Sequence, residues 1–144
     1  MKIHIGIVAS SFNDFITKRL LNACLMELRH NGLGDDQFTT VWVPGSLEIP
    51  VTAYKLAQRK NIDAVICLGA VIRGETYHFE VVANECARGI MEVSLLTAKP
   101  VVMGVLTTET VAQAQARSGD RSSNNKGREC ACTALAMIAL LEKI

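Results

Sequence analysis

The chain has 144 residues, of which 49% are hydrophobic and 20% charged, and its formal net charge is +1. This length and composition predict one globular domain, residues 1–144, and are not typical of a disordered protein. Because lysine and arginine are scattered and no apolar run reaches the roughly 18 residues that span a bilayer, we expect neither nucleic acid nor a membrane as a partner.

Apolar runs and amphipathic stretches alternate along the chain, which predicts strands separated by helices. In chain order we expect a strand at 2–9, a helix from 13 or 14 to 31, a strand at 38–43, a helix from 46, a strand at 64–72, a helix at 79–97, a strand at 100–106, and helices at 110–118 and 127–141. Polar residues suit two of the helix starts: Asn13 or Asp14 as the cap of the first, and Ser46 as the cap of the second, with Glu48 and Pro50 in its first turn.

Strands separated by helices of this length pair in parallel through right-handed crossovers. The expected fold is therefore α/β: a three-layer α/β/α sandwich with a four-stranded parallel sheet in flavodoxin-like order and helices on both faces. Ligands bind beyond the carboxyl ends of the strands in such sheets. The segments that follow these ends are "SSFND", "PGSLE", "RGETYH" and "TTET", so we expect the chemistry to be divided among them.

Two residues at this edge have a structural and a functional interpretation. Phe12 precedes the helix cap, so its ring is either a hydrophobic staple on the first helical turn or a platform for a flat ring. Glu48 at the third helical position is typical of a capping box, but its carboxylate also lies at the binding edge. Both alternatives stay open for each residue.

The segment "GAVIRGETYHF" places a cation, an acid, a hydroxyl and an imidazole in a single turn. Gly69 and Gly74 have the spacing of a P-loop, but Glu75 stands at the lysine position, so a nucleoside-triphosphate site is not expected. Gly74, Glu75 and Thr76 lead into a helix start whose free N–H groups suit a phosphate. His78 is either a structural or solvated histidine or a proton-transfer residue, because imidazole titrates near neutral pH.

The polar segment 117–128, "RSGDRSSNNKGR", carries Arg117, Arg121, Lys126 and Arg128. A solvated surface is the ordinary interpretation, although a guanidinium binds phosphate bidentately and a loop of this length is often functional. These features indicate a phosphorylated small molecule and a proton-transfer residue without naming a reaction.

Cysteine and histidine give no sign of a metal site. The five cysteines have no CxxC spacing, and four lie in apolar or helical runs, which favours buried free thiols. His4, His30 and His78 are far apart and no ligand cluster accompanies them, so we expect no metal. The N-terminal "MKIHIGIVAS" is typical of a strand and not of a signal peptide, so we expect a cytoplasmic protein.

The segments "SSFND", "VPGSLEIP", "AVIRGETYHFEVVANE", "VLTTET" and "NNKG" have the order and spacing found in lumazine synthases, and the chain resembles that family over nearly its whole length. The resemblance implies a transferase of the penultimate step of riboflavin biosynthesis. Such an enzyme condenses 5-amino-6-(D-ribitylamino)uracil with 3,4-dihydroxy-2-butanone 4-phosphate to give 6,7-dimethyl-8-ribityllumazine, phosphate and water. It also implies that no metal or organic cofactor takes part.

The resemblance also implies roles for individual residues. Phe12 would stack on the pyrimidine, and the ribityl chain and ring edge would be held by Ser46, Leu47, Glu48, Ala70, Val71 and Ile72. Glu75 and Thr76 would hold the phosphate chiefly through backbone amides, and Arg117 would bind it, with Lys126 as a further candidate. His78 would be the catalytic residue that transfers protons.

The family assembles as pentamers with active sites between adjacent subunits, and some members form 60-subunit icosahedral shells. We expect a homopentamer, leave the shell open, and regard riboflavin synthase as a further partner. Met103 stands where members often have an aromatic residue that lines the neighbouring subunit's pocket, and its sulfur can cover a ring as well. Many relatives have an N-terminal extension that pairs with a neighbour's sheet, and we expect this contact to be missing here.

Three other functions are alternatives to this one. An archaeal-type riboflavin synthase has a similar fold but acts on two lumazines and needs no phosphate site, which the turn at 74–76 and Arg117 disfavour. A non-catalytic flavodoxin-like signalling module would need an acidic phosphoacceptor after the first strand, where this chain has Ser10, Ser11 and Phe12. A lumazine-binding module without catalysis is disfavoured by the presence of His78, Arg117 and Glu48.

Overall fold

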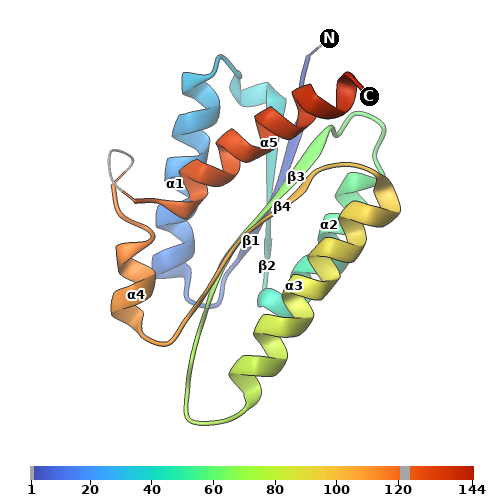
Figure 1. Cartoon of the computed structure of the whole chain (residues 1–144). Helices are drawn as coiled ribbons and strands as arrows, with labels where there is room; N and C mark the ends of the chain where they lie inside the picture. Colours follow the sequence, from blue (N-terminus) through green and yellow to red (C-terminus); the bar gives the residue numbers. More distant parts are fainter. Residues whose placement is uncertain (1, 121–123) are drawn as a thin grey trace.

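The computed structural model describes residues 2–120 and 124–144, so Arg121 lies outside the described residues. Strands and helices alternate along the chain (Figure 1). Their bounds are β1 Ile5–Ser10, α1 Asp14–His30, η1 Asp35–Gln37, β2 Phe38–Val43, η2 Ser46–Glu48, α2 Ile49–Ala57, β3 Ala64–Ile72, α3 His78–Thr97, β4 Val101–Thr108, α4 Val111–Ala116 and α5 Lys126–Glu142, where η marks a 3-10 helix.

The strands form one parallel sheet in the order β2-β1-β3-β4. Figure 1 shows α1 and α5 on one side of this sheet and α2 and α3 on the other. The predicted three-layer α/β/α sandwich is therefore confirmed. All four strands run the same way, so their carboxyl ends meet at one edge of the sheet.

Alternating side chains of the strands build two separate cores. On β3, Ile66 and Leu68 pack with α1 and α5, whereas Val65 and Cys67 pack with α2 and α3. All four side chains are fully buried. This is why the third strand is apolar at nearly every position, as expected for a parallel strand covered on both faces.

The strand boundaries depend on the partners of each strand. β2 and β3 occupy the predicted ranges, but β1 begins at Ile5 and not at residue 2, because its pairing with Phe38 and Ala64 begins there. The preceding His4 N–H donates to the Asp63 carboxylate instead (2.8 Å). β4 extends two residues beyond its predicted end, because Thr107 and Thr108 pair with the last residues of β3.

The predicted helix caps differ from the observed ones. Asn13 stands at the N-cap of α1 in the left-handed conformation (φ 61°), but its side chain does not cap the helix. The prediction that Ser46 caps the second helix is wrong: residues 46–48 form a 3-10 turn, and neither Ser46 nor Glu48 caps through its side chain. In α4, Thr110 is the cap itself and accepts a hydrogen bond from the Gln113 N–H (3.1 Å).

Four of the five cysteines are buried, as predicted, and Cys132 is exposed. Burial raises the pKa of the Cys86 thiol to about 11, which keeps it protonated at neutral pH. Among residues 2–120 and 124–144, no three histidine, cysteine or acidic side chains gather in a way that could hold a metal ion. Within the same ranges, no helix has the length and apolar character needed to cross a membrane.

Candidate active site

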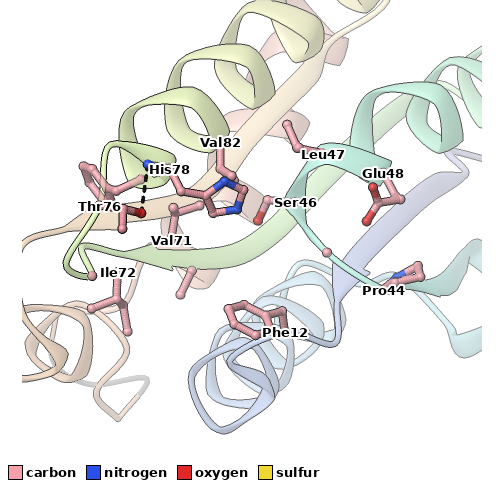
Figure 2. Close-up of a pocket in the computed structure, with 14 residues that line it drawn as sticks. Phe12, Pro44, Ser46, Leu47, Glu48, Val71, Ile72, Thr76, His78 and Val82 are labelled. Carbon is pink, nitrogen blue, oxygen red and sulfur yellow. Dashed lines mark hydrogen bonds between the residues drawn. The ribbon is translucent and has the colours of Figure 1, made fainter.

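A cleft of about 490 Å³ opens at the carboxyl edge of the sheet. Its walls come from the β1–α1 turn, the η2 turn after β2, the end of β3 and the start of α3 (Figure 2). The lining residues are Phe12, Pro44, Gly45, Ser46, Leu47, Glu48, Ala70, Val71, Ile72, Gly74, Thr76, His78, Phe79 and Val82. The cleft therefore collects three of the four segments that were expected to share the chemistry.

The Phe12 turn is fixed by main-chain bonds to its neighbours. The N–H of Ser11 donates to the carbonyl of Val43 (2.8 Å), and the N–H of Phe12 donates to that of Pro44 (3.1 Å). The Asn13 side-chain amide donates to the carbonyl of Ala70 (2.9 Å), which connects this turn to β3. The turn that carries Phe12 is thus bonded to the end of β2 on one side and to β3 on the other.

The ring of Phe12 is 70% exposed. A hydrophobic staple would bury this ring on the first turn of α1, so the structure does not support that alternative. An aromatic face left open at the mouth of a cleft suits stacking with a flat ligand, because it supplies contact area at little cost in side-chain entropy.

The opposite wall is the η2 turn, in which Ser46 is buried at the base while Leu47 and Glu48 are exposed. Gly69 on β3 lies directly beneath, and a Cβ atom there would meet the Ser10 Cβ at 3.1 Å and the Ser46 Oγ at 3.5 Å. A side chain at position 69 would therefore displace the floor of the cleft. Since Glu48 makes no capping bond, its carboxylate is open to a ligand.

His78 and Thr76 lie where β3 leads into α3. The His78 N–H donates to the Thr76 hydroxyl at 3.4 Å, and Figure 2 shows the imidazole reaching from the start of α3 toward the η2 turn. Glu48 and His78 are the titratable side chains among the lining residues. A helix start with an exposed hydroxyl and free N–H groups is suited to an anion.

Several predicted site residues lie outside this cleft. Arg117 and Lys126 line a second pocket of about 340 Å³, together with Thr107, Thr108 and Asn124. Glu75 is exposed between two lining residues but is not part of the lining. Met103 is partly buried and packs against the core under α2 and α3. A single copy therefore brings Phe12, the η2 residues and the end of β3 together with Thr76 and His78, but not with Met103 or Arg117.

Sequence reasoning missed four lining residues: Pro44, Gly45, Phe79 and Val82. The first two belong to "VPGSLEIP", so their place in that segment was an available signal. Val82 is partly buried, packs against the core under α2 and α3 and also lines the cleft. A helical residue at the edge of a core serves both surfaces, and periodicity alone does not reveal this.

Comparison with known families gives one match of nearly full length. Residues 2–142 match the family described as 6,7-dimethyl-8-ribityllumazine synthase.

Proposed function

The chain belongs to the 6,7-dimethyl-8-ribityllumazine synthase family, and on this premise we propose that it condenses 5-amino-6-(D-ribitylamino)uracil with 3,4-dihydroxy-2-butanone 4-phosphate. The family places the protein among the transferases of riboflavin biosynthesis and implies small-molecule substrates and an oligomer. The observation that carries the proposal is the cleft itself, which is lined by an exposed aromatic residue, a carboxylate, a hydroxyl and an imidazole.

The ribitylaminouracil would occupy the part of the cleft between Phe12 and the η2 turn. Its pyrimidine would stack on the Phe12 ring, while its ribityl hydroxyls and ring edge would bond to Ser46, Leu47 and Glu48 and to the end of β3 at 70–72. A planar, polar ligand fits a wall with one aromatic face and several hydrogen-bonding groups opposite.

The phosphate of the second substrate would bind at the start of α3, through the Thr76 hydroxyl and the amides near Glu75. Helix starts stabilise anions because their first N–H groups have no partner within the helix. Arg117 faces a different pocket of the same chain, so we propose that the guanidinium reaches this phosphate from an adjacent subunit of a homopentamer.

The reaction needs positioning more than strong electrophilic activation. The primary amine of the uracil attacks the ketone and, with loss of one water, forms an imine, and phosphate leaves by elimination after a proton is removed from carbon. Ring closure by the ribitylamino nitrogen and loss of a second water complete the lumazine. His78 would move the protons, and holding two substrates side by side would supply most of the rate acceleration.

One assay tests the proposed function. The protein is mixed with both substrates, and lumazine fluorescence and inorganic phosphate are measured in parallel. We expect one phosphate for each lumazine formed. Conversion of added lumazine to riboflavin would support a riboflavin synthase instead, and binding of lumazine without turnover would support a non-catalytic module.

A further inference from the structure

The loop between β3 and α3 carries Thr76 and leads directly into His78, the first residue of α3, yet it has little packing of its own. Residues 73–78 are all exposed. One main-chain bond connects the start of the loop to β4, from the Arg73 N–H to the carbonyl of Thr108 (2.9 Å). Exposed segments with few apolar contacts open easily, so some other interaction has to hold the reactive groups in place.

The side chain of Arg73 makes that interaction. Its Nη1 and Nη2 donate to the two carboxylate oxygens of Glu80 at 3.0 and 2.6 Å. Its Nε donates to Glu109 at 2.5 Å, and its guanidinium lies 4.4 Å from the centre of the Phe79 ring. We call these four residues the Arg73 network.

The Arg73 network connects three elements around the loop. Arg73 immediately follows β3, Phe79 and Glu80 lie in the first turn of α3, and Glu109 follows β4. One guanidinium thus connects the two ends of the loop that carries Thr76 and leads into His78. Because both ends are held by the same planar group, the loop can adopt few other conformations.

Isolated surface ion pairs contribute little, so the geometry of this pair matters. A bidentate guanidinium–carboxylate contact fixes orientation as well as distance, and a ring beneath the guanidinium adds a cation–π contact. The Arg73 and Glu80 side chains are 35% and 31% exposed. In the ion pair between Lys18 and Asp14, by comparison, each side chain is more than half exposed. Hydrogen bonding to Arg73 also lowers the pKa of Glu80, which favours the ionised carboxylate that this contact needs.

Arg73 is not a substrate ligand in this arrangement. It is absent from the cleft lining although Gly74, Thr76, His78 and Phe79 belong to it. Its nitrogens already donate to two carboxylates, so a role through the loop is favoured over direct contact with phosphate.

We infer that Arg73 is a positioning residue, which holds the 74–78 loop so that the Thr76 hydroxyl and the His78 imidazole face the cleft together. The expected effects on kcat rest on the proposed function, whereas the expected effects on the structure of the loop do not. Displacing a reacting group by about 1 Å can cost about 100-fold in rate, so loosening the loop is expected to matter more than the loss of one surface ion pair.

The kinetic test compares Arg73→Gln with Arg29→Gln. Arg29 is a matched control because its guanidinium also pairs with a carboxylate, Asp35, and lies over a phenylalanine ring, Phe38, at the opposite end of the sheet. We expect Arg73→Gln to lower kcat by about 10- to 100-fold, and Arg29→Gln to leave kcat unchanged. Equal effects of the two substitutions would overturn the inference.

Two further variants separate positioning from charge. Lysine keeps the charge but cannot make the bidentate contact, so Arg73→Lys should lower kcat nearly as much as Arg73→Gln does. An unchanged kcat in Arg73→Lys would contradict a positioning role. In a His78→Ala background, Arg73→Gln should lower kcat only a few-fold further, because one of the two groups that it positions, the imidazole, is gone. An undiminished loss in that background would show that Arg73 does not act through His78.

Hydrogen exchange tests the same inference without any substrate. The main-chain N–H groups of Glu80 and Val81 donate to the carbonyl of Tyr77 at the end of the loop. These amides should exchange faster in Arg73→Gln than in the unaltered protein, and Arg29→Gln should leave them unchanged. Unaltered exchange at these amides in Arg73→Gln would overturn the positioning role whatever the activity. If the unaltered protein forms no lumazine, the proposed function fails, and the exchange result alone decides whether Arg73 holds the loop.

Discussion

Phe12 and His78 face one cleft from different elements, and they are expected to affect different kinetic constants. The side chain of Phe12 is exposed, and the turn that carries it is bonded to the end of β2 and to β3. His78 is also exposed, and its main chain is held by the Thr76 hydroxyl and by the neighbouring Arg73 network. At the scale of single residues, we therefore expect mutations to separate the proposed binding of the ring from the proposed transfer of protons.

Replacing His78 with alanine should leave weak activity. A positioned acid or base contributes about 100-fold or somewhat more, and here positioning supplies the rest. We expect kcat at saturating concentrations of both substrates to fall about 100-fold. His30→Ala, an exposed histidine at the end of α1, is the control. An undiminished kcat in His78→Ala would contradict its role in proton transfer.

Replacing Phe12 with alanine should weaken binding of one substrate selectively. Loss of the stacking surface should raise the KM for ribitylaminouracil by about tenfold, equivalent to roughly 1.4 kcal/mol, and leave the KM for butanone phosphate nearly unchanged. Phe15→Ala is the matched control, because Phe15 is also exposed, in the first turn of α1, but does not line the cleft. Similar changes in both KM values would show that the ring is not a stacking platform.

At the scale of whole elements, α5 packs against α1 through a close backbone contact. A Cβ atom on Gly127, at the start of α5, would lie 1.9 Å from the carbonyl oxygen of Leu20. Glycine is therefore required here by close approach, although alanine usually stabilises helices.

Gly127→Ala is expected to lower the free energy of unfolding by about 3 kcal/mol, because the two helices must separate or α5 must shift. Urea denaturation measures this change. Gly74→Ala is the control, since no atom lies within 4 Å of the position of its added Cβ, and its stability should stay within about 0.5 kcal/mol. Unchanged stability of Gly127→Ala would mean that α1 and α5 do not pack as described.

The elements also differ in how far the sequence could predict them. The apolar runs of β2 and β3 had clear ends, so their predicted bounds match the observed ones. Ser46 looked like a cap, but the chain forms a 3-10 turn there and its hydroxyl is buried near Gly69. That contact lies between residues far apart in the sequence, which local propensity does not report.

The candidate site shows the same limit. The segments after β1, β2 and β3 were expected to meet, and they line one cleft. The partners of Arg73 were not predicted, because Glu80 lies seven residues away across a loop and Glu109 lies on another element. Spacing rules describe pairs within one helix or one hairpin, so contacts that close a loop appear only in the folded structure.

At the scale of the whole molecule, the proposed reaction needs a second copy, because the cleft and Arg117 belong to different pockets of one chain. The cleft holds Phe12, Thr76 and His78, while Arg117 faces the second pocket. In a ring of identical subunits, each contact joins one surface of a copy to a different surface of the next. The proposed pentamer would place the second pocket of one subunit beside the cleft of its neighbour.

The assembly itself is measured by light scattering coupled to size-exclusion chromatography. We expect a mass of five chains or of a multiple of five. A monomer or dimer that still forms lumazine at the normal rate would contradict the shared site, because Arg117 would then have no route to the phosphate.

Arg117→Ala should raise the KM for butanone phosphate and leave the KM for ribitylaminouracil nearly unchanged. A guanidinium that binds the phosphate bidentately contributes to that substrate alone. Initial rates measured with each substrate varied in turn separate the two constants. A rise confined to the KM for ribitylaminouracil would place Arg117 at the wrong end of the cleft.

The most direct test of the shared cleft mixes two impaired proteins. One carries Phe12→Ala with His78→Ala, so its cleft is defective, and the other carries Arg117→Ala. The two are unfolded and refolded together, and lumazine formation is followed at a limiting concentration of butanone phosphate. If each site joins the cleft of one subunit to Arg117 of the next, random assembly restores about one quarter of the sites, and activity should rise well above that of either parent. Activity equal to the average of the separately refolded parents would contradict the account.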